Sequence, residues 1–514
     1  MTARVTEIPL TSALSVDLTE KRAKAQGLIG QGYRLGSTDD PWDRNWNPLP
    51  SLPDTELSRH MTYMWGRSYD LHRNNGYVAG PSTRLAGLVG ELVPQFLTKD
   101  ATERAELSRL WGLWAPQAMS DGVGSFAMFC ELLVGNACQG GDVLVPLEHR
   151  EEIEDGPIPL RVNLVDAWRV ANSESKDKDG KTISLGVKKD KGVEVGYFVS
   201  RDDGNAPYYF PRIKNGRPGA VLFRRPDPLR RPGQSRSTPI ATAYLNNIKD
   251  AWDHERAHTR TAGSRARMKA ILQATDVEGI KKIFQAAKEA EATDPEMARI
   301  IRQSAKATTV ETPDATTMIL PKWAEYKATP TDTVDPNFTT YMKGQKEAVA
   351  PGWGFGREIA FLEMGDANFA RARIHFMQAQ SEVKRWIRDI ASQVGRPLIK
   401  LFVQYAWAYG YLSKEPTAEA TDVAWHGLPV EYMDLGNEVS AYADAKASGI
   451  MSPQAISRRS NTDWELTLRE EMDYALAWKN LKEEFGLSDE DIASALGVRK
   501  EAPTTSTTQQ EPTP

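Results

Sequence analysis

The chain is poor in the residues from which disulfide-rich and metal-binding proteins are built. It has two cysteines, Cys130 and Cys138, and seven histidines among 514 residues. Eight positions apart on a predicted helix, the two thiols would lie about 12 Å apart at about 1.5 Å per residue. That separation is too large for a disulfide. We therefore expect both cysteines to be reduced and to pack as small apolar side chains.

Long apolar runs are missing as well. No stretch approaches the roughly 20 apolar residues of a membrane helix, and residues 1–7 lack the apolar centre of a signal peptide. We therefore expect a protein that stays inside the cell that makes it and contacts no membrane. The formal net charge is only −5, from 64 basic and 69 acidic residues. This balance argues against a protein that coats nucleic acid by bulk charge.

What the chain does contain predicts a mainly α fold with a β-rich module, an α+β class. Its length favours two to four structural units. Apolar residues repeat every three or four positions in most of the chain. This spacing predicts helices over residues 54–75, 77–93, 103–114, 125–135, 240–269, 337–348, 368–394, 398–409, 441–448, 453–459, 464–485 and 489–496. Residues 142–225 instead predict strands, interrupted by turn signals.

The most informative stretch, 351–409, joins a glycine-rich loop to a long helix. Gly352, Gly354 and Gly356 resemble a phosphate cradle only superficially, because no clear strand precedes them and no Gly-Lys-Ser/Thr follows. We interpret them as a hinge in a mobile loop, since glycine tolerates unusual backbone angles.

The long helix that follows carries one apolar stripe, and basic residues lie off this stripe. They include Arg371, Arg373, Lys384 and Arg388. Two interpretations stay open for them. They could form a solvated or inter-subunit face held by ion pairs, or they could touch a phosphate backbone in passing.

A second motif suggests chemistry. His254-Glu255-Arg256-Ala257-His258 places two histidines at i and i+4 on one helix face, which could bind zinc with Glu255 as a general base. The charged neighbours and the missing third ligand count against this hypothesis. The alternative function is therefore a zinc metallohydrolase built on His254 and His258, and the competing interpretation is an exposed charged helix face.

Four segments, in order, resemble a known family. They are Arg73–Val78, with its paired asparagines, the basic connector Arg230–Pro239, the loosely similar helix with Trp252, Asp253 and Glu255, and Asn368–Arg373 at the start of the long helix. Their order resembles that of the portal proteins of tailed bacteriophages, specifically the lambda-type portals. Ser237 departs from the family's preferred glycine, and Arg224 stands where the family has a histidine.

The resemblance implies a ring-forming portal fold with no catalysis and no cofactor. It assigns the chain to an N-terminal arm (1–53), a wing (54–236, with the β-rich module 142–225), a stem helix (237–269), a clip (270–335), a second stem helix (336–350), a tunnel loop (351–366), a long kinked helix with a return to the wing (367–430), crown helices (431–498) and a disordered tail (499–514).

The resemblance also implies a place and a set of partners. About twelve subunits would form a ring at the capsid vertex of the virion, assembled in the host cytoplasm. Double-stranded DNA would pass through it during packaging and ejection. The other expected partners are the terminase large subunit, the major capsid or scaffold protein, and a head-tail adaptor. A head or tail scaffold protein of another type is a third possibility.

Within such a ring, the resemblance places two sets of residues near the channel. The tunnel loop would place Trp353, Phe355, Arg357 and Glu358 at the DNA channel. For Trp353 and Phe355 a second interpretation stays open, in which the two rings pack the loop against its neighbour. The long helix would direct Arg371, Arg373, Lys384 and Arg388 toward the channel or the next subunit.

Overall fold

The computed structural model describes most of the chain from residue 50 to residue 486. The described residues are 50–90, 92–151, 156–171, 176, 180–201, 203, 205–274, 309–312, 315–321, 337–363, 365, 369–427, 435–460 and 464–486. The chain divides into two units, residues 1–57 and 58–514. Most of the predicted arm, the predicted helix 489–496 and the predicted tail lie outside the described residues.

The first two helices meet at one residue. α2 (Pro53–Asn74) and α3 (Gly76–Val89) are separated by Asn75, whose side chain accepts a hydrogen bond from the Tyr77 N–H at 2.8 Å. Asn75 has an extended backbone, so it ends one helix and caps the next. Both helices were predicted, although α3 ends earlier than expected because the chain leaves the helix at Gly90, with φ 52°.

An aromatic core joins helices that are far apart in the sequence. α4 (Ala101–Trp114), α5 (Phe126–Gly140) and α12 (Arg396–Ala408) contribute to it. The Trp111 ring lies 5.1 Å from Phe126, 5.3 Å from Phe402 and 5.8 Å from Trp425, all edge to face. Such contacts add to the burial of large apolar surfaces.

The two cysteines lie in the same core. Cys130 and Cys138 are on α5, are free thiols and are fully buried. Burial raises the pKa of the Cys138 thiol to about 12. The prediction of reduced, buried cysteines is confirmed.

Residues 142–224 form the predicted β-rich module. One sheet has the order β10-β2-β3 and another has the order β4-β5-β6-β7, and their paired strands are antiparallel. The strands are β2 (Asp142–His149), β3 (Leu160–Val162), β4 (Thr182–Ser184), β5 (Val187–Asp190), β6 (Val193–Val199), β7 (Tyr208–Pro211), β8 (Ile213–Lys214), β9 (Arg217–Pro218) and β10 (Ala220–Arg224). A separate apolar cluster, including Leu144, Val187 and Tyr197, fills the space between the sheets.

A further pair of strands was not predicted. β1 (Val93–Phe96) pairs antiparallel with β14 (Val423–His426), in the register Val93 to His426 and Phe96 to Val423. The strands are four residues each, too short for a periodic signal in the sequence. They connect the first hundred residues to the segment after residue 420.

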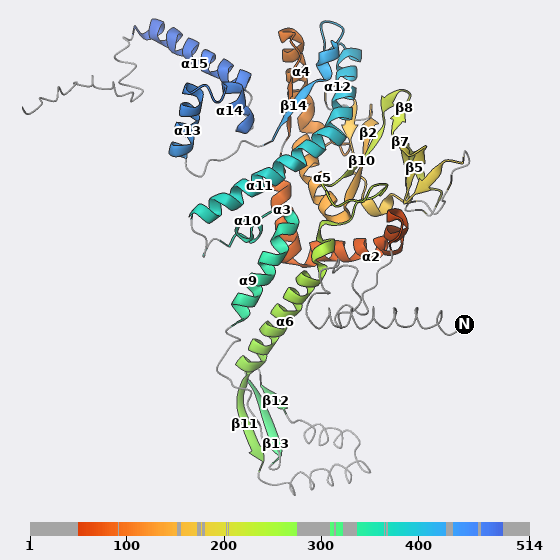
Figure 1. Ribbon diagram of the computed structural model, residues 1–514, viewed down its shortest axis with the longest axis vertical. Coiled ribbons are helices and arrows are strands. Elements are labelled where there is room, and N and C mark those ends of the chain that lie inside the picture. Colours follow the sequence, from red (N-terminus) through yellow and green to blue (C-terminus); the bar gives the residue numbers. More distant parts are fainter. Residues whose placement is uncertain are drawn as a thin grey trace, which may run out of the picture. The chain divides into compact units, whose positions relative to one another are not determined.

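The next elements are two neighbouring helices and a three-stranded sheet. A 3₁₀ turn, η4 (Ile240–Tyr244), leads into α6 (Leu245–Arg267), which packs beside α9 (Phe338–Val349) (Figure 1). β11 (Met268–Ala274) follows α6 directly. It pairs in parallel with β13 (Ala315–Pro321), which pairs antiparallel with β12 (Thr309–Thr312).

The long helix is confirmed as a helix with an irregular centre. α11 (Phe369–Ile390) passes through a π-helical turn, η6 (Ala391–Gly395), into α12. The irregularity lies just before Pro397, which cannot donate a hydrogen bond to the preceding turn. The remaining elements are η2 (Ala115–Gln117), η3 (Ala167–Arg169), η5 (Ala350–Trp353), α10 (Arg357–Phe361), η7 (Ala418–Thr421), α13 (Leu435–Ala447), α14 (Pro453–Arg459) and α15 (Trp464–Phe485). Among the described helices, none has the length and apolar character needed to cross a bilayer.

Candidate functional site

The glycine-rich segment is a packed junction rather than an exposed loop. Trp353 and Phe355 are 1% and 3% exposed. The Trp353 indole N–H donates to the Ser82 hydroxyl on α3 at 2.8 Å. Two short helices, η5 and α10, occupy most of residues 350–361. Both rings are therefore packed inside the single chain, and their placement at a channel stays a prediction.

Close packing explains the three glycines. A Cβ on Gly356 would lie 2.4 Å from the His375 ring, and one on Gly352 would lie 2.5 Å from the Tyr244 ring. Gly354 has φ 73°, and a Cβ there would lie 2.5 Å from Glu382. The glycines let neighbouring elements approach the segment closely. Packing thus accounts for the three glycines in this structure, and the interpretation of the segment as a hinge stays a prediction.

Arg357 and Glu358 are also buried, and they belong to an ionic cluster between α9, α10 and α11. The Glu358 carboxylate is 0% exposed. It lies 2.5 Å from His375 Nδ1 and 3.0 Å from Arg371 Nε, and Arg357 is 3.8 Å away. Arg357 also pairs with Glu363 at 3.3 Å. Neither side chain is exposed in the single chain, and the predicted place of Arg357 and Glu358 at a channel stays a prediction.

Opposing effects act on the Glu358 carboxyl. Burial raises its pKa, because the charged form loses hydration. The backbone N–H of the same residue, the His375 hydrogen bond and the positive charges of His375 and Arg371 lower it. The lowering effects win, so the pKa of Glu358 lies below its ordinary value.

The basic residues of α11 lie at or near the surface of the chain. Arg371 is 41% exposed and also lies 3.4 Å from Glu347. Arg388 is 70% exposed and pairs with the adjacent Asp389 at 3.0 Å. Arg373 is half-buried and Lys384 is exposed, although partial burial lowers the pKa of Lys384. The structure thus brings Arg371 to the buried cluster and leaves the other three outside it.

The two histidines of the suspected zinc motif pack against aromatic rings. The His258 ring stacks on Phe338 at 3.8 Å with an interplanar angle of 14°, and the His254 ring lies 4.5 Å from Tyr341. Glu255 accepts a hydrogen bond from the Tyr77 hydroxyl at 2.9 Å. Within the residues that the structure describes, no three His, Cys, Asp or Glu side chains gather in a group that could hold a metal. The motif therefore serves the contact between α6 and α9.

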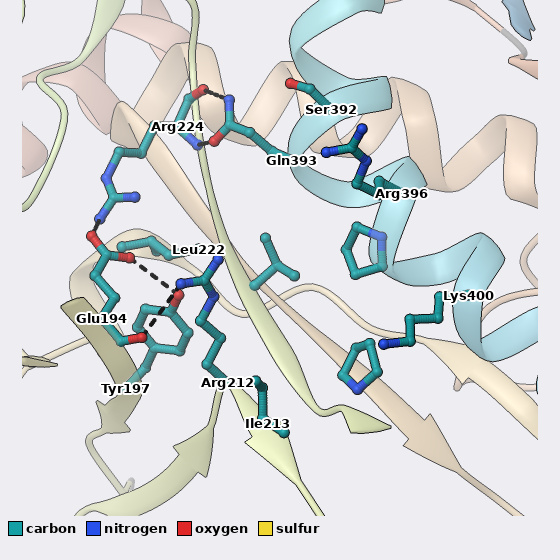
Figure 2. Close-up of a pocket in the computed structure, with 13 residues that line it drawn as sticks. Glu194, Tyr197, Arg212, Ile213, Leu222, Arg224, Ser392, Gln393, Arg396 and Lys400 are labelled. Carbon is teal, nitrogen blue, oxygen red and sulfur yellow. Dashed lines mark hydrogen bonds and ion pairs between the residues drawn. The ribbon is translucent and has the colours of Figure 1, made fainter. Parts of the chain in front are cut away.

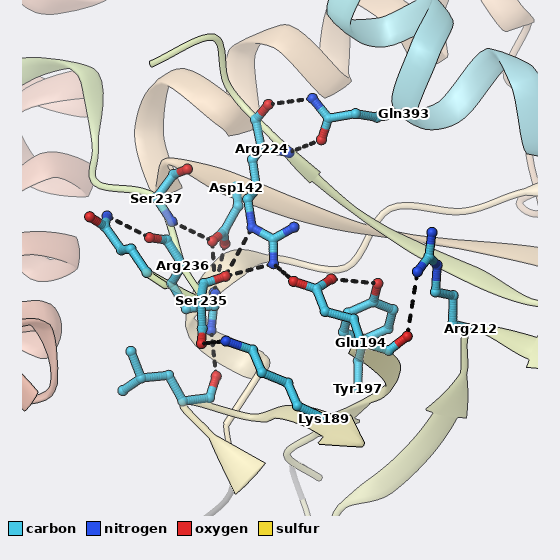
Figure 3. Close-up of polar contacts among 12 residues, drawn as sticks. Asp142, Lys189, Glu194, Tyr197, Arg212, Arg224, Ser235, Arg236, Ser237 and Gln393 are labelled. Atoms are coloured by element: carbon cyan, nitrogen blue, oxygen red, sulfur yellow. Dashed lines mark hydrogen bonds and ion pairs between the residues drawn. The ribbon is translucent and has the colours of Figure 1, made fainter. Parts of the chain in front are cut away.

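The basic connector contains an ion pair that sequence reasoning missed. Arg236 and Asp142 are both 0% exposed and are joined by two hydrogen bonds of 2.7 and 2.8 Å (Figure 3). Arg236 also donates to the backbone oxygens of Val170, Leu185 and Ala167 at 2.6–3.1 Å. One guanidinium thus connects the connector to β2, η3 and the β4–β5 turn. Only its position in the Arg-Pro-Gly-Gln segment marked it in the sequence.

Arg224, the last residue of β10, links the module to the long helix. Its guanidinium pairs with Glu194 at 2.5 Å. Its backbone N–H donates to the Gln393 side chain at 3.0 Å, and the Gln393 amide donates back to the Arg224 carbonyl at 3.0 Å (Figure 3). Burial, assisted by the Glu194 charge, raises the pKa of the nearby Tyr197 to about 12.

A cavity of about 710 Å³ opens between the β-rich module and the start of α12. We call it the basic groove. Figure 2 shows Arg396 and Lys400 from α12 on one side and Arg212, Glu194 and Tyr197 from the module on the other. A second cavity of about 880 Å³, the adjoining groove, shares Pro218 with it. Its lining includes Lys214, Arg217, Tyr208, Tyr209, Leu401 and Tyr405.

Comparison with known proteins decides the family. A family model described as phage portal protein, lambda family, matches residues 40–386. The chain belongs to this portal family. It is therefore a structural protein of the portal vertex of a phage-type virion and has no enzymatic activity. This excludes the zinc metallohydrolase.

Solved structures similar to this portal chain are distant. One is the neck of a native gene transfer agent particle, with 13% identity over 80% of this chain and 93% of the other, and a TM-score of 0.37. Another is an HK97-family phage portal protein from Corynebacterium diphtheriae, with 12% identity over 70% of this chain and 94% of the other, and a TM-score of 0.32. A comparison with curated protein sequences gives no match.

Proposed function

We propose that about twelve copies of this portal chain form a ring at one capsid vertex, through which double-stranded DNA enters and leaves the particle. The family match over residues 40–386 carries this proposal. A ring of identical subunits needs heterologous contacts, in which the front of one subunit meets the back of the next. The near-neutral charge of −5 suits a channel, since each neutralised phosphate would add affinity and hinder movement.

Within this ring we propose the wing at residues 54–236 and the stem at α6 and α9. The clip would occupy 270–335 and the crown 431–498. The side-by-side packing of α6 and α9, and the small sheet that follows α6, support the stem and clip assignments.

The structure of the junction refines the proposed tunnel loop. Because Trp353, Phe355 and Glu358 are buried, we propose that they fix the base of the loop in one chain. The part that faces DNA would follow α10, where Leu362 is 64% exposed and has φ 55°. On this basis, Arg371 and its exposed neighbours on α11 would face the channel or the next subunit.

The partners that we propose are the terminase large subunit, the major capsid or scaffold protein, and a head-tail adaptor. Native mass spectrometry of the purified chain tests the ring directly. We expect a closed assembly of about twelve subunits of 57.2 kDa each, with a central opening in end-on electron micrographs. A protein that stays monomeric under all conditions would contradict the proposal.

A further inference from the structure

Unpaired positive charge surrounds the two grooves beside α12. Besides Arg150, which pairs with Glu148, five exposed cations line them: Arg212, Lys214, Arg217, Arg396 and Lys400. None of the five has an ion pair with a carboxylate in the part of the chain that the structure describes. Arg212 does donate to the Glu194 backbone oxygen at 3.5 Å, and Arg217 contacts Tyr405. Neither partner is a carboxylate, so the positive charge of the five residues is not neutralised by an ion pair, although the whole chain is slightly acidic.

The carboxylates near the grooves already have partners. Glu194 pairs with Arg224 at 2.5 Å, and Glu148 pairs with Arg150 at 2.7 Å. These two carboxylates therefore do not neutralise the charge of the five cations. An anionic group that entered the grooves would meet cations on both sides, from α12 and from the β8–β9 hairpin.

The grooves are also apolar and aromatic at their base. The basic groove is lined by Pro218, Val221, Leu222 and Pro397, and the adjoining groove contains Leu401 among its aromatic residues. Tyr208 is 51% exposed. Volumes of about 710 and 880 Å³ lie within the range of pockets that enclose bulky side chains or small ligands. A segment with acidic residues next to large aromatic rings would pair with the cations and would also cover the apolar surfaces.

One segment of this chain has that composition. Asp39-Asp40-Pro41-Trp42-Asp43-Arg44-Asn45-Trp46 contains three aspartates, one arginine and two tryptophans. It lies just before the described residues, and the sequence predicts it to be an extended arm with aromatic anchors. Its three carboxylates and two indole rings match the cations and the apolar lining of the grooves.

We propose that the grooves beside α12 bind residues 39–46 of a neighbouring copy of this chain. The aspartates would pair with cations such as Arg396 and Lys400, and Trp42 and Trp46 would enter the two grooves. This inference rests on the proposed ring, and it adds a specific contact between subunits. The aromatic and apolar lining favours a protein segment over nucleic acid, whose backbone needs charge rather than apolar pockets.

Cysteine cross-linking tests the contact. Asn45→Cys and Ser392→Cys place one thiol on the arm and one at the basic groove, without removing a charge or a ring. The native thiols are fully buried, and the raised pKa of Cys138 makes it a poor nucleophile. Co-expressed subunits carrying one substitution each should give a covalent dimer on oxidation, which disappears on reduction. A matched pair of Asn45→Cys with Val123→Cys, at a site 84% exposed, should give none.

Charge reversal provides the second measurement. Arg396→Glu with Lys400→Glu, or Asp39→Lys with Asp40→Lys, should each lower the fraction of assembled rings at a fixed subunit concentration at least fivefold. Combining both pairs should restore assembly. Lys414→Glu, at another exposed cation, should leave the fraction unchanged.

The outcomes separate the two proposals. A wild-type chain that forms no ring overturns the proposed function. A normal ring with no cross-link, or with a cross-link confined to one doubly substituted chain, overturns only the arm contact. Loss of retention of duplex DNA in Arg396→Glu/Lys400→Glu rings without any cross-link would assign the grooves to nucleic acid and would also overturn it.

Discussion

Two buried carboxylates, Asp142 and Glu358, have cationic partners of very different accessibility. Asp142 pairs with Arg236, and neither side chain is exposed to water. Glu358 is equally buried, but its partner Arg371 is 41% exposed and also contacts Glu347. The first pair lies inside one chain and holds the connector to the β-rich module. The second connects a buried junction to the surface of the long helix.

The difference shows which ionic contacts can communicate with other molecules. A fully enclosed pair cannot be reached by DNA or by another subunit, so its role is structural. A half-exposed arginine can exchange one carboxylate for an anion outside the chain at modest cost, because water already solvates part of it. A contact between another molecule and Arg371 on α11 would therefore alter the ion pair of Arg371 with the buried Glu358.

The largest effect should come from breaking the enclosed pair. Arg236→Met leaves Asp142 buried without its cation and removes the guanidinium donor from three backbone carbonyls, of which Ala167 keeps its bond from the Val170 N–H. Removing one partner of a buried pair costs about 3–5 kcal/mol, and urea unfolding should show a loss of this size. Arg388→Met, which removes a 70% exposed ion pair with Asp389, is the control and should cost less than about 1 kcal/mol. Equal losses of unfolding free energy in Arg236→Met and Arg388→Met would contradict the distinction between enclosed and exposed ion pairs.

Overpacking the junction should have the next largest effect. Gly356→Ala forces a methyl group against the His375 ring, and such overpacking typically costs about 1–3 kcal/mol. Gly344→Ala is the matched control, because a Cβ at this α9 position meets nothing within 4 Å. It should stabilise the chain by about 0.5–1 kcal/mol. The free energy of unfolding measured for both variants distinguishes a packed junction from a mobile loop, which would tolerate either change.

A smaller, pH-dependent effect should follow from Glu358→Gln. Because the folded pKa of Glu358 is lowered, the carboxylate adds stability above its ordinary pKa of about 4.5. That contribution disappears as the pH falls through the folded pKa. We expect the variant to be less stable than the wild type by about 1–2 kcal/mol at neutral pH. Urea unfolding at pH 3–7 should show the gap closing on the acidic side, and a gap that stays constant would contradict the assignment.

Asp142→Asn provides the comparison for that experiment. Arg236 cannot turn toward water, whereas Arg371 can, so Asp142→Asn should cost more than Glu358→Gln at neutral pH. A larger loss of stability for Glu358→Gln than for Asp142→Asn would contradict the conclusion that the enclosed pair depends more strongly on its partner.

The smallest effect should come from His258→Ala on α6, outside both ionic sites. Loss of the stacked contact with Phe338 should cost about 0.5–1.5 kcal/mol. Metal content, measured by elemental analysis, should be the same in wild type and variant. A metal present in stoichiometric amount and lost in the variant would contradict the packing role.

The sequence predicted elements better than contacts. α14 and α15 begin and end where their apolar spacing predicted, and the β-rich module lies within its predicted limits. These features depend on local periodicity. β1 and β14 were missed because pairing partners more than 300 residues apart leave no local signal.

The junction shows close packing that the sequence did not predict. Glycines in a row predict a flexible loop when they are considered alone. In the fold, Gly352, Gly354 and Gly356 are required by the side chains of Tyr244, Glu382 and His375, which come from other elements. The enclosed partner of Arg236 was missed for the same reason, since Asp142 lies 94 residues earlier in the chain.

The pairing of β1 with β14 has a consequence for synthesis of the chain. A ribosome that has made β1 must add more than 300 residues before β14 exists to pair with it. Until then the Trp111 cluster also lacks Phe402 and Trp425, so its apolar surface stays open. A chain that ends before β14 therefore cannot close this core, and its exposed apolar surface would make it prone to aggregation.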